Sequence, residues 1–153
     1  MSLLRQMGAL VDVGTDSVTV ESRPLRAISA ELTDSIDLLP VLVVLAAAAA
    51  GESDLRGIGR ARLKESDRVA GLADGLRRMG IEVVVEKPRM LVTGGIPRPA
   101  VIDPHGDHRL AMAFGVLGTL TDGTTIEDAG CVGKTFPDFW DMLRRLGVEV
   151  RTV

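Results

Sequence analysis

Hydrophobic and polar positions follow one phrase that occurs three times along the chain. It reads LRQMGALV at residues 4–11, LRRMGIEV at 76–83 and LRRLGVEV at 143–150. Basic residues precede a glycine in each copy, and an alternating apolar run follows it. Basic residues in a last turn and glycine just beyond it are typical of a helix end, and the alternation is typical of a strand. Each copy therefore predicts a helix that stops and leads into a strand.

The strands after the first two copies are expected to form hairpins. Residues 9–13 and 18–21 flank a Gly-Thr-Asp-Ser turn, and residues 81–86 and 90–93 flank Lys-Pro-Arg. Short apolar runs separated by such turns predict antiparallel pairing. A strand is expected after the third copy as well.

Helices are expected between these strands. The longest apolar run, residues 38–50, has 13 residues, which is too short to span a bilayer and predicts a buried helix. We expect Asp37 to open this helix. Asp107 opens a comparable helix that ends near residues 118–123, and further helices follow Asp67 and Asp138.

The order of these elements predicts an α/β (α+β) fold made of repeated βαβαββ units. The glycines of the three phrases, at positions 8, 80 and 147, lie 72 and 67 residues apart, which is the spacing expected of one such unit. We interpret residues 1–153 as a single partial domain. Its first repeat covers 9–95, and its second, incomplete repeat covers 98–153.

Composition narrows the class of protein. An apolar content of 46% supports a packed core rather than disorder, and a net charge of −3 disfavours nucleic acid and anionic membranes as partners. With three Phe, one Trp and no Tyr, the chain offers few platforms for stacking on bases. The one cysteine, Cys131, excludes an internal disulfide and fits the reducing cytoplasm.

Ionisable residues gather where loops enter the predicted helices. Acidic residues there have an ordinary explanation as helix caps, which applies to Asp67 and Asp138. Cations are disfavoured at that end of a helix. Four recur at these junctions: Lys64, Arg68, Arg109 and Lys134. They predict either a shared site for a phosphate or carboxylate, or four separately solvated charges.

Other motifs give weaker signals. The segment Asp103 to His108 resembles part of a metal-ligand cluster, but the chain has only two histidines, so a zinc site would be short of ligands. The segment before Lys134 resembles a P-loop but has Asp128 where the first glycine is required. No metal is therefore expected, and Cys131 is interpreted as a small buried residue rather than a nucleophile.

Three further motifs occur in order: RLKESDR at 62–68, GDHRLAM at 106–112 and GKTFPDF at 133–139. Together they closely resemble the C-terminal part of the 5-enolpyruvylshikimate-3-phosphate synthase family. The resemblance implies a fold with two domains, each built of three βαβαββ units, of which this chain would hold about two. It also implies transfer of the enolpyruvyl group of phosphoenolpyruvate to the 5-hydroxyl of shikimate 3-phosphate, with release of phosphate and without a cofactor.

The resemblance also assigns roles to individual residues. Asp37 matches the carboxylate that accepts the hydroxyl proton, and Glu65 matches the acid/base group near the methylene carbon. Lys64 matches a contact of shikimate 3-phosphate. Arg68, Arg109 and Lys134 match a cationic clamp on phosphoenolpyruvate, in which Lys134 is also a candidate proton donor. His108 lies beside this clamp.

Some alternatives stay open from the sequence. Asp34 is a rival of Asp37, and Arg60 stands where some members of the family carry an asparagine that contacts shikimate 3-phosphate. UDP-N-acetylglucosamine enolpyruvyl transferase is a second candidate activity, and a non-catalytic fragment that binds a ligand or partner is a third. Because the basic loop of the family's N-terminal segments is absent from these residues, the expected partners are the two substrates and the missing N-terminal part of the same enzyme.

Overall fold

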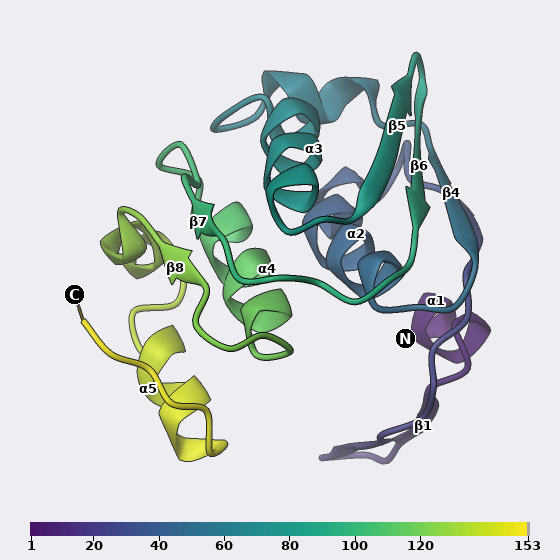
Figure 1. The fold of residues 1–153 in the computed structure, drawn as a ribbon. Helices are drawn as coiled ribbons and strands as arrows, with labels where there is room; N and C mark the ends of the chain where they lie inside the picture. Colours follow the sequence, from purple (N-terminus) through teal and green to yellow (C-terminus); the bar gives the residue numbers. More distant parts are fainter. Residues whose placement is uncertain (153) are drawn as a thin grey trace.

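The main sheet has four strands with two helices on one face (Figure 1). In a computed structural model, which describes residues 1–152, the strand order is β3 (Ser29–Glu31), β4 (Glu52–Arg56), β6 (Arg89–Thr93) and β5 (Glu82–Glu86). Strands β3 and β4 are parallel, and the remaining neighbours are antiparallel. With α2 (Leu39–Ala47) and α3 (Arg68–Arg78), this segment has the predicted order βαβαββ.

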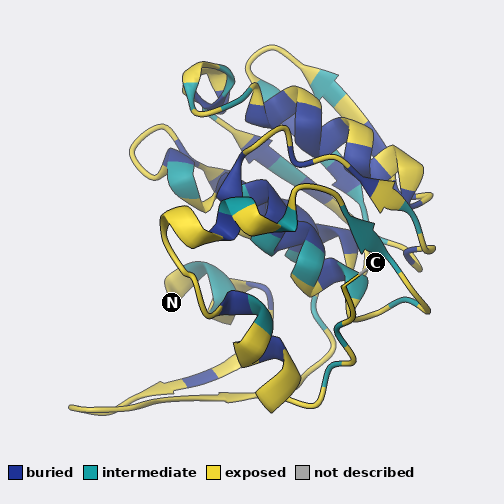
Figure 2. Ribbon diagram, turned by 90° about the vertical axis from the view of Figure 1, so that its left-hand side faces the viewer, coloured by how far each residue is buried: buried dark blue, intermediate teal, exposed yellow. Residues whose placement is uncertain are grey.

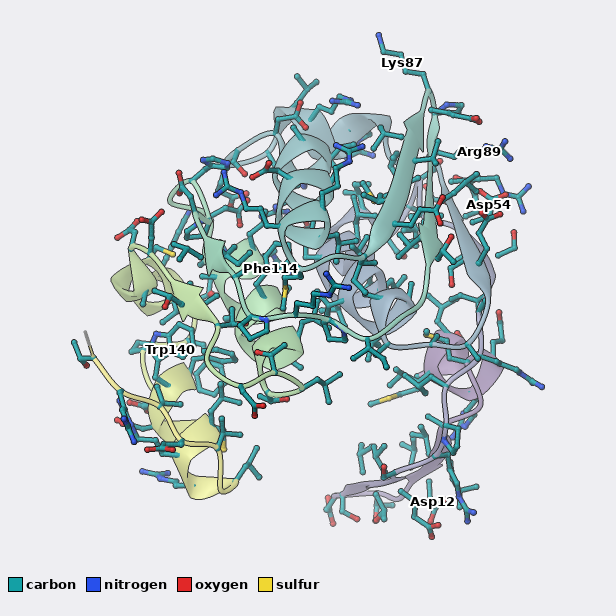
Figure 3. The ribbon with its side chains drawn as sticks, in the orientation of Figure 1. Asp12, Asp54, Lys87, Arg89, Phe114 and Trp140 are labelled. Carbon is teal, nitrogen blue, oxygen red and sulfur yellow. The ribbon has the colours of Figure 1, made fainter. Side chains whose placement is uncertain are left out.

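The sheet has one buried and one solvated face because its side chains alternate. Leu55, Met90 and Val92 point toward the helices and are fully buried. The outer face is polar: Asp54 on β4 forms an ion pair with Arg89 on β6, and Figure 3 shows the two together on this side. The sheet therefore contributes to the core from one side only.

The three copies of the phrase end their helices in the same way. Gly8, Gly80 and Gly147 have positive φ angles of 94°, 76° and 92°, a conformation that glycine adopts at little steric cost. The first arginine of each phrase then donates to the backbone carbonyl six residues on, in the pairs Arg5–Val11, Arg77–Val83 and Arg144–Val150. The predicted helix stops are confirmed.

The first hairpin lies apart from the main sheet. It follows α1 (Ser2–Gln6) and consists of β1 (Leu10–Val13) and β2 (Val18–Glu21), which pair only with each other among the described residues. It extends away from the other elements and is mostly exposed (Figure 2). Both predicted hairpins are confirmed, while the division into repeats at 9–95 and 98–153 stays a prediction.

The C-terminal segment contains less β-strand than expected. It contains β7 (Val101–Ile102), α4 (His108–Gly118), β8 (Thr125–Ile126) and α5 (Phe139–Arg145), with β7 parallel to β8. The strand expected at residues 148–150 does not form, so that prediction is wrong. A strand needs a hydrogen-bonded neighbour, and no strand within residues 1–152 pairs with this run.

The core lies between the sheet and helices α2, α3 and α4. The apolar run at 38–50 forms α2, which begins after a short 3-10 turn, η1 (Ile36–Leu38), so Asp37 lies just before the helix rather than at its first residue. Pro40 is tolerated because it lies in the first turn. Helix α2 packs against α4, and most of its side chains are buried.

Helices α3 and α4 approach closely at Gly75, which gives a test of the packing. A β-carbon at this position would overlap the ring of Phe114, which is fully buried. Overpacking costs about 1–3 kcal/mol, whereas the better helix propensity of alanine returns at most about 1 kcal/mol. We therefore expect Gly75→Ala to lower the free energy of unfolding, measured by urea denaturation. Gly130→Ala is the control, because a β-carbon built there meets no atom within 4 Å beyond its chain neighbours and the backbone of its own 3-10 helix; an equal loss in both variants would contradict the packing.

Candidate functional site

The candidate site lies where four short segments meet at the starts of α3 and α4. Asp67 precedes α3 and accepts from the backbone N–H of Ala70, while Asp107 precedes α4 and accepts from that of Arg109. The 3-10 turn η1 lies beside η2 (Gly59–Leu63), and α4 packs on η3 (Ala129–Lys134). Residues far apart in the sequence therefore reach one place.

The guanidinium of Arg68 is the centre of this site. Arg68 is 1% exposed, and its Nε donates to Asp107 Oδ2 at 2.8 Å. Its Nη1 donates to Asp37 Oδ1 at 2.8 Å, and its Nη2 donates to Glu65 Oε2 at 2.6 Å. Carboxylates thus surround the cation, and charge-assisted bonds of these lengths are strong.

The other predicted cations surround the same carboxylates. Lys64 Nζ lies 3.2 Å from Asp37 Oδ1, and Arg109 Nη2 lies 4.0 Å from Asp37 Oδ2. Lys134 Nζ lies 3.3 Å from Glu65 Oε1. The charged cluster, as we name it, comprises Asp37, Lys64, Glu65, Arg68, Asp107, Arg109 and Lys134. All four cations predicted from the sequence lie in it.

These contacts set the protonation of the acidic residues. Burial alone would raise the pKa of Asp37, but hydrogen bonds from Lys64 and Arg68 and the charge of Arg109 outweigh it, so the pKa lies below its usual value. The pKa of Glu65 is also lowered, by a hydrogen bond from its own backbone N–H and by Lys134 and Arg68. Both groups are therefore carboxylates at neutral pH.

His108, the first residue of α4, is buried beside the cluster. Its Nδ1 has no hydrogen-bond partner among the described residues. Burial lowers its pKa, and the cations Lys134 and Arg109 act in the same direction, which together outweigh the nearby carboxylates. The imidazole is therefore neutral at neutral pH.

Several candidates lie outside the cluster. Asp34 is exposed, and among the described residues it makes no ion pair, so Asp37 is the carboxylate that joins the cations. Arg60 is exposed on η2. Within residues 1–152, no group of His, Cys, Asp and Glu is arranged to hold a metal ion. Cys131 is half-buried, and burial raises the pKa of its thiol, which disfavours the reactive thiolate.

The sequence did not single out Asp107 and Ser66 as site residues. The Asp107 side chain is fully buried, bonds Arg68, and accepts a hydrogen bond from Ser66 Oγ at 3.2 Å. No role was assigned to Asp107 beyond opening a helix, and its burial depends on the packing of α4 against α3. Its place between the glycine and histidine of GDHRLAM was the one available signal.

Solved structures resemble this fold over nearly the whole chain. An EPSP synthase from Acinetobacter baumannii superimposes with a TM-score of 0.83 and 31% identity, covering 98% of this chain and 39% of that one. The enolpyruvyl transferase NikO from Streptomyces tendae superimposes with a TM-score of 0.81 and 27% identity, covering 98% and 35%. The chain therefore has the α/β fold of the enolpyruvyl transferases.

Sequence comparison identifies the family. Residues 1–143 match the family described as EPSP synthase (3-phosphoshikimate 1-carboxyvinyltransferase). The chain is 51% identical over 150 residues to a 3-phosphoshikimate 1-carboxyvinyltransferase of Dehalococcoides mccartyi (strain 195). It belongs to the EPSP synthase family, which confirms the resemblance seen in the motifs.

The match covers 98% of this chain but 36% of the Dehalococcoides protein. The chain thus spans about a third of the length of its curated relatives. Within residues 1–152, none of the helices is both long and apolar enough to cross a membrane.

The pKa directions predict how stability depends on pH. Because the folded pKa of Asp37 is lowered, its ion pairs stabilise the fold above the unfolded pKa, and this contribution is lost as pH falls through the folded pKa. We expect the thermal midpoint to begin to fall below about pH 5 and to continue falling as pH passes through the lowered folded pKa of Asp37. The difference between wild type and Asp37→Asn should be largest at neutral pH and shrink on acidification, as measured by circular dichroism.

Asp34→Asn is the matched control for this pH series. It removes an exposed carboxylate three positions before Asp37, so its midpoint should follow that of the wild type at each pH. A difference between wild type and Asp37→Asn that stays constant across the range would contradict the assignment of the acid-labile stability to Asp37.

Proposed function

We propose that this chain supplies the phosphoenolpyruvate-binding side of a 3-phosphoshikimate 1-carboxyvinyltransferase. The reaction would move an enolpyruvyl group to the 5-hydroxyl of shikimate 3-phosphate and release phosphate. The observation that supports it most is the charged cluster, in which Lys64, Arg68, Arg109 and Lys134 gather at one place. Fixed cations of this kind bind a small polyanion and stabilise charge on the departing phosphate.

The two carboxylates at the rim would divide the proton transfers. Asp37 would accept the proton of the attacking hydroxyl, because its lowered pKa keeps it ionised. Glu65 and Lys134, which form an ion pair, would act at the methylene carbon. Lys64 would contact shikimate 3-phosphate, and His108 would lie beside the clamp as a neutral imidazole.

The ligand would have to replace contacts that the cluster makes with itself. The Asp37 and Glu65 side chains keep 47% and 32% of their surface exposed, so an anion can reach the cations that they hold. Electrostatic attraction is worth more in such a partly buried site than in water. No metal or organic cofactor enters this proposal, and we place the enzyme in the cytoplasm.

Arg109 offers a direct test of the clamp. Its side chain is 40% exposed, and its contacts with Asp37 are long, 3.5 Å to the backbone carbonyl and 4.0 Å to the carboxylate, so it can turn toward a ligand. In an enzyme containing the complete active site, Arg109→Ala should weaken phosphoenolpyruvate binding by about tenfold or more and shikimate 3-phosphate binding much less, by isothermal titration. Arg78→Ala, at the other end of α3, removes an equal charge as a control. Equal losses for the two substrates in Arg109→Ala would count against the clamp.

We further propose that the exposed hairpin binds the part of the enzyme that this chain does not include. The register Val11–Val20 and Val13–Val18 puts these four valines on one face, the valine face. Val13, Val18 and Val20 are each about half exposed. The first two copies of the phrase are 72 residues apart, and the positions that correspond to the valine face in the second copy lie on β5 and β6. There Val83, Met90 and Val92 are buried under helices. An isolated two-stranded hairpin is marginally stable, so a covering segment like α2 and α3 is required.

The two proposals together predict that this chain alone has no turnover. Catalysis in the proposed reaction needs groups from both domains closed around the substrates. Mixing the chain with the portion of the Dehalococcoides mccartyi relative that it does not cover should restore phosphate release and give a complex in size-exclusion chromatography. Val20→Lys should prevent both, because a charge on the valine face would be buried in the complex.

Thr19→Lys is the control for this experiment. Thr19 pairs with Asp12 on the opposite face of the hairpin, so a lysine there stays in water. Complex formation by Val20→Lys at the wild-type level would show that another surface binds the partner. Turnover by the chain alone would show that the missing segment is dispensable.

A further inference from the structure

The carboxylate of Asp107 is the most deeply buried member of the charged cluster. Its side chain is 0% exposed, whereas those of Asp37 and Glu65 reach solvent. It accepts from Arg68 Nε at 2.8 Å, from Ser66 Oγ at 3.2 Å and from the Arg109 backbone N–H at 2.9 Å. A ligand that arrives from solvent can displace Asp37 or Glu65 but cannot reach Asp107.

The contacts divide the guanidinium of Arg68 into two edges. The Nε edge faces Asp107, whose second oxygen also lies 3.4 Å from Nη2. The Nη1 and Nη2 groups face Asp37 and Glu65. Since a guanidinium is a planar, rigid fork, an anchor on one edge fixes the direction of the other. Asp107 therefore determines where the N–H groups of Arg68 point when the exposed carboxylates leave.

Capping of α4 does not by itself explain this burial. Asp67 caps α3 by accepting from Ala70 N, and its side chain is 40% exposed. Asp107 caps α4 in the same way, by accepting from a backbone N–H, but its carboxylate is shielded from water. Burying a carboxylate raises the free energy of the folded state unless a cation pairs with it. The paired cation is Arg68, and the capped N–H belongs to Arg109, so one carboxylate is bonded to two of the proposed clamp residues.

We propose that Asp107 is a positioning residue that holds Arg68 and the start of α4 in the geometry that captures an anion. It acts through Arg68 and Arg109 and does not touch the substrate. The anion in question is phosphoenolpyruvate, so this inference rests on the proposed function.

The variants Asp107→Asn and Asp107→Ser separate this role from capping. Asparagine and serine both cap helices well, so the bond from Arg109 N can persist. Neither can supply a charged acceptor for Arg68. We expect each to move the Arg68 Nε–H resonance in nuclear magnetic resonance spectra and to speed its exchange with water. Phosphoenolpyruvate should bind about tenfold more weakly.

Asp67→Asn is the matched control, because it makes the same change at the cap of α3 and should leave both measurements near wild type. Arg68→Lys combined with Asp107→Asn should bind no more weakly than Arg68→Lys alone, since asparagine keeps the bond from Arg109 N and removes only the charged acceptor of Arg68. Circular dichroism checks that each variant folds.

The two readouts distinguish the possible failures. An Nε–H resonance of Arg68 that is unchanged in folded Asp107→Asn overturns the positioning role, as does a changed resonance with unchanged phosphoenolpyruvate affinity. Affinity is measured in an enzyme containing the complete active site, as for Arg109→Ala. A wild-type enzyme of that kind that binds no phosphoenolpyruvate counts against the proposed function, and the Nε–H resonance then decides alone whether Asp107 fixes Arg68.

Discussion

The architecture of the site depends on one buried cation, the guanidinium of Arg68. A charged side chain is almost never fully buried unless it is paired. Arg68 satisfies this requirement with carboxylates from three different segments, namely the turn before α2, the loop before α3 and the start of α4. Because each of these bonds is directional, the three segments cannot shift independently. The same ion pairs that compensate for the burial of Arg68 therefore fix the relative positions of the elements that carry the cluster.

This constraint also explains how one cluster can be both stable and open to a ligand. The carboxylate on the Nε edge of Arg68 is sealed from water, while those on the other edge are partly exposed. The contact between Arg68 and Asp107 is therefore a permanent part of the fold, whereas a ligand can replace the contacts of Arg68 with Asp37 and Glu65. An anion that replaces them exchanges one set of charge-assisted bonds for another. Arg68 is already removed from water before the anion binds, so binding does not have to supply the free energy of its desolvation. A preformed site of this kind needs little rearrangement.

The sequence predicted more of the local structure than of the site. Helix stops at Gly8, Gly80 and Gly147 follow from backbone chemistry within a few residues, and they were found as expected. The four cations of the cluster could be named because basic residues are out of place at helix starts. Asp107 could not be separated from an ordinary cap, since the feature that distinguishes it is burial by α3 and α4. That depends on contacts between residues 39 positions apart.

The three copies of the phrase show where local pattern stops determining structure. After the second copy the hairpin joins β4 and is covered by helices. After the first copy it forms but keeps three valines exposed, and after the third no strand forms. The helix stop and its arginine bond recur in all three because they use only nearby atoms. A strand, in contrast, takes its hydrogen bonds from another segment, so nearly the same eight residues give three outcomes according to what lies beside them.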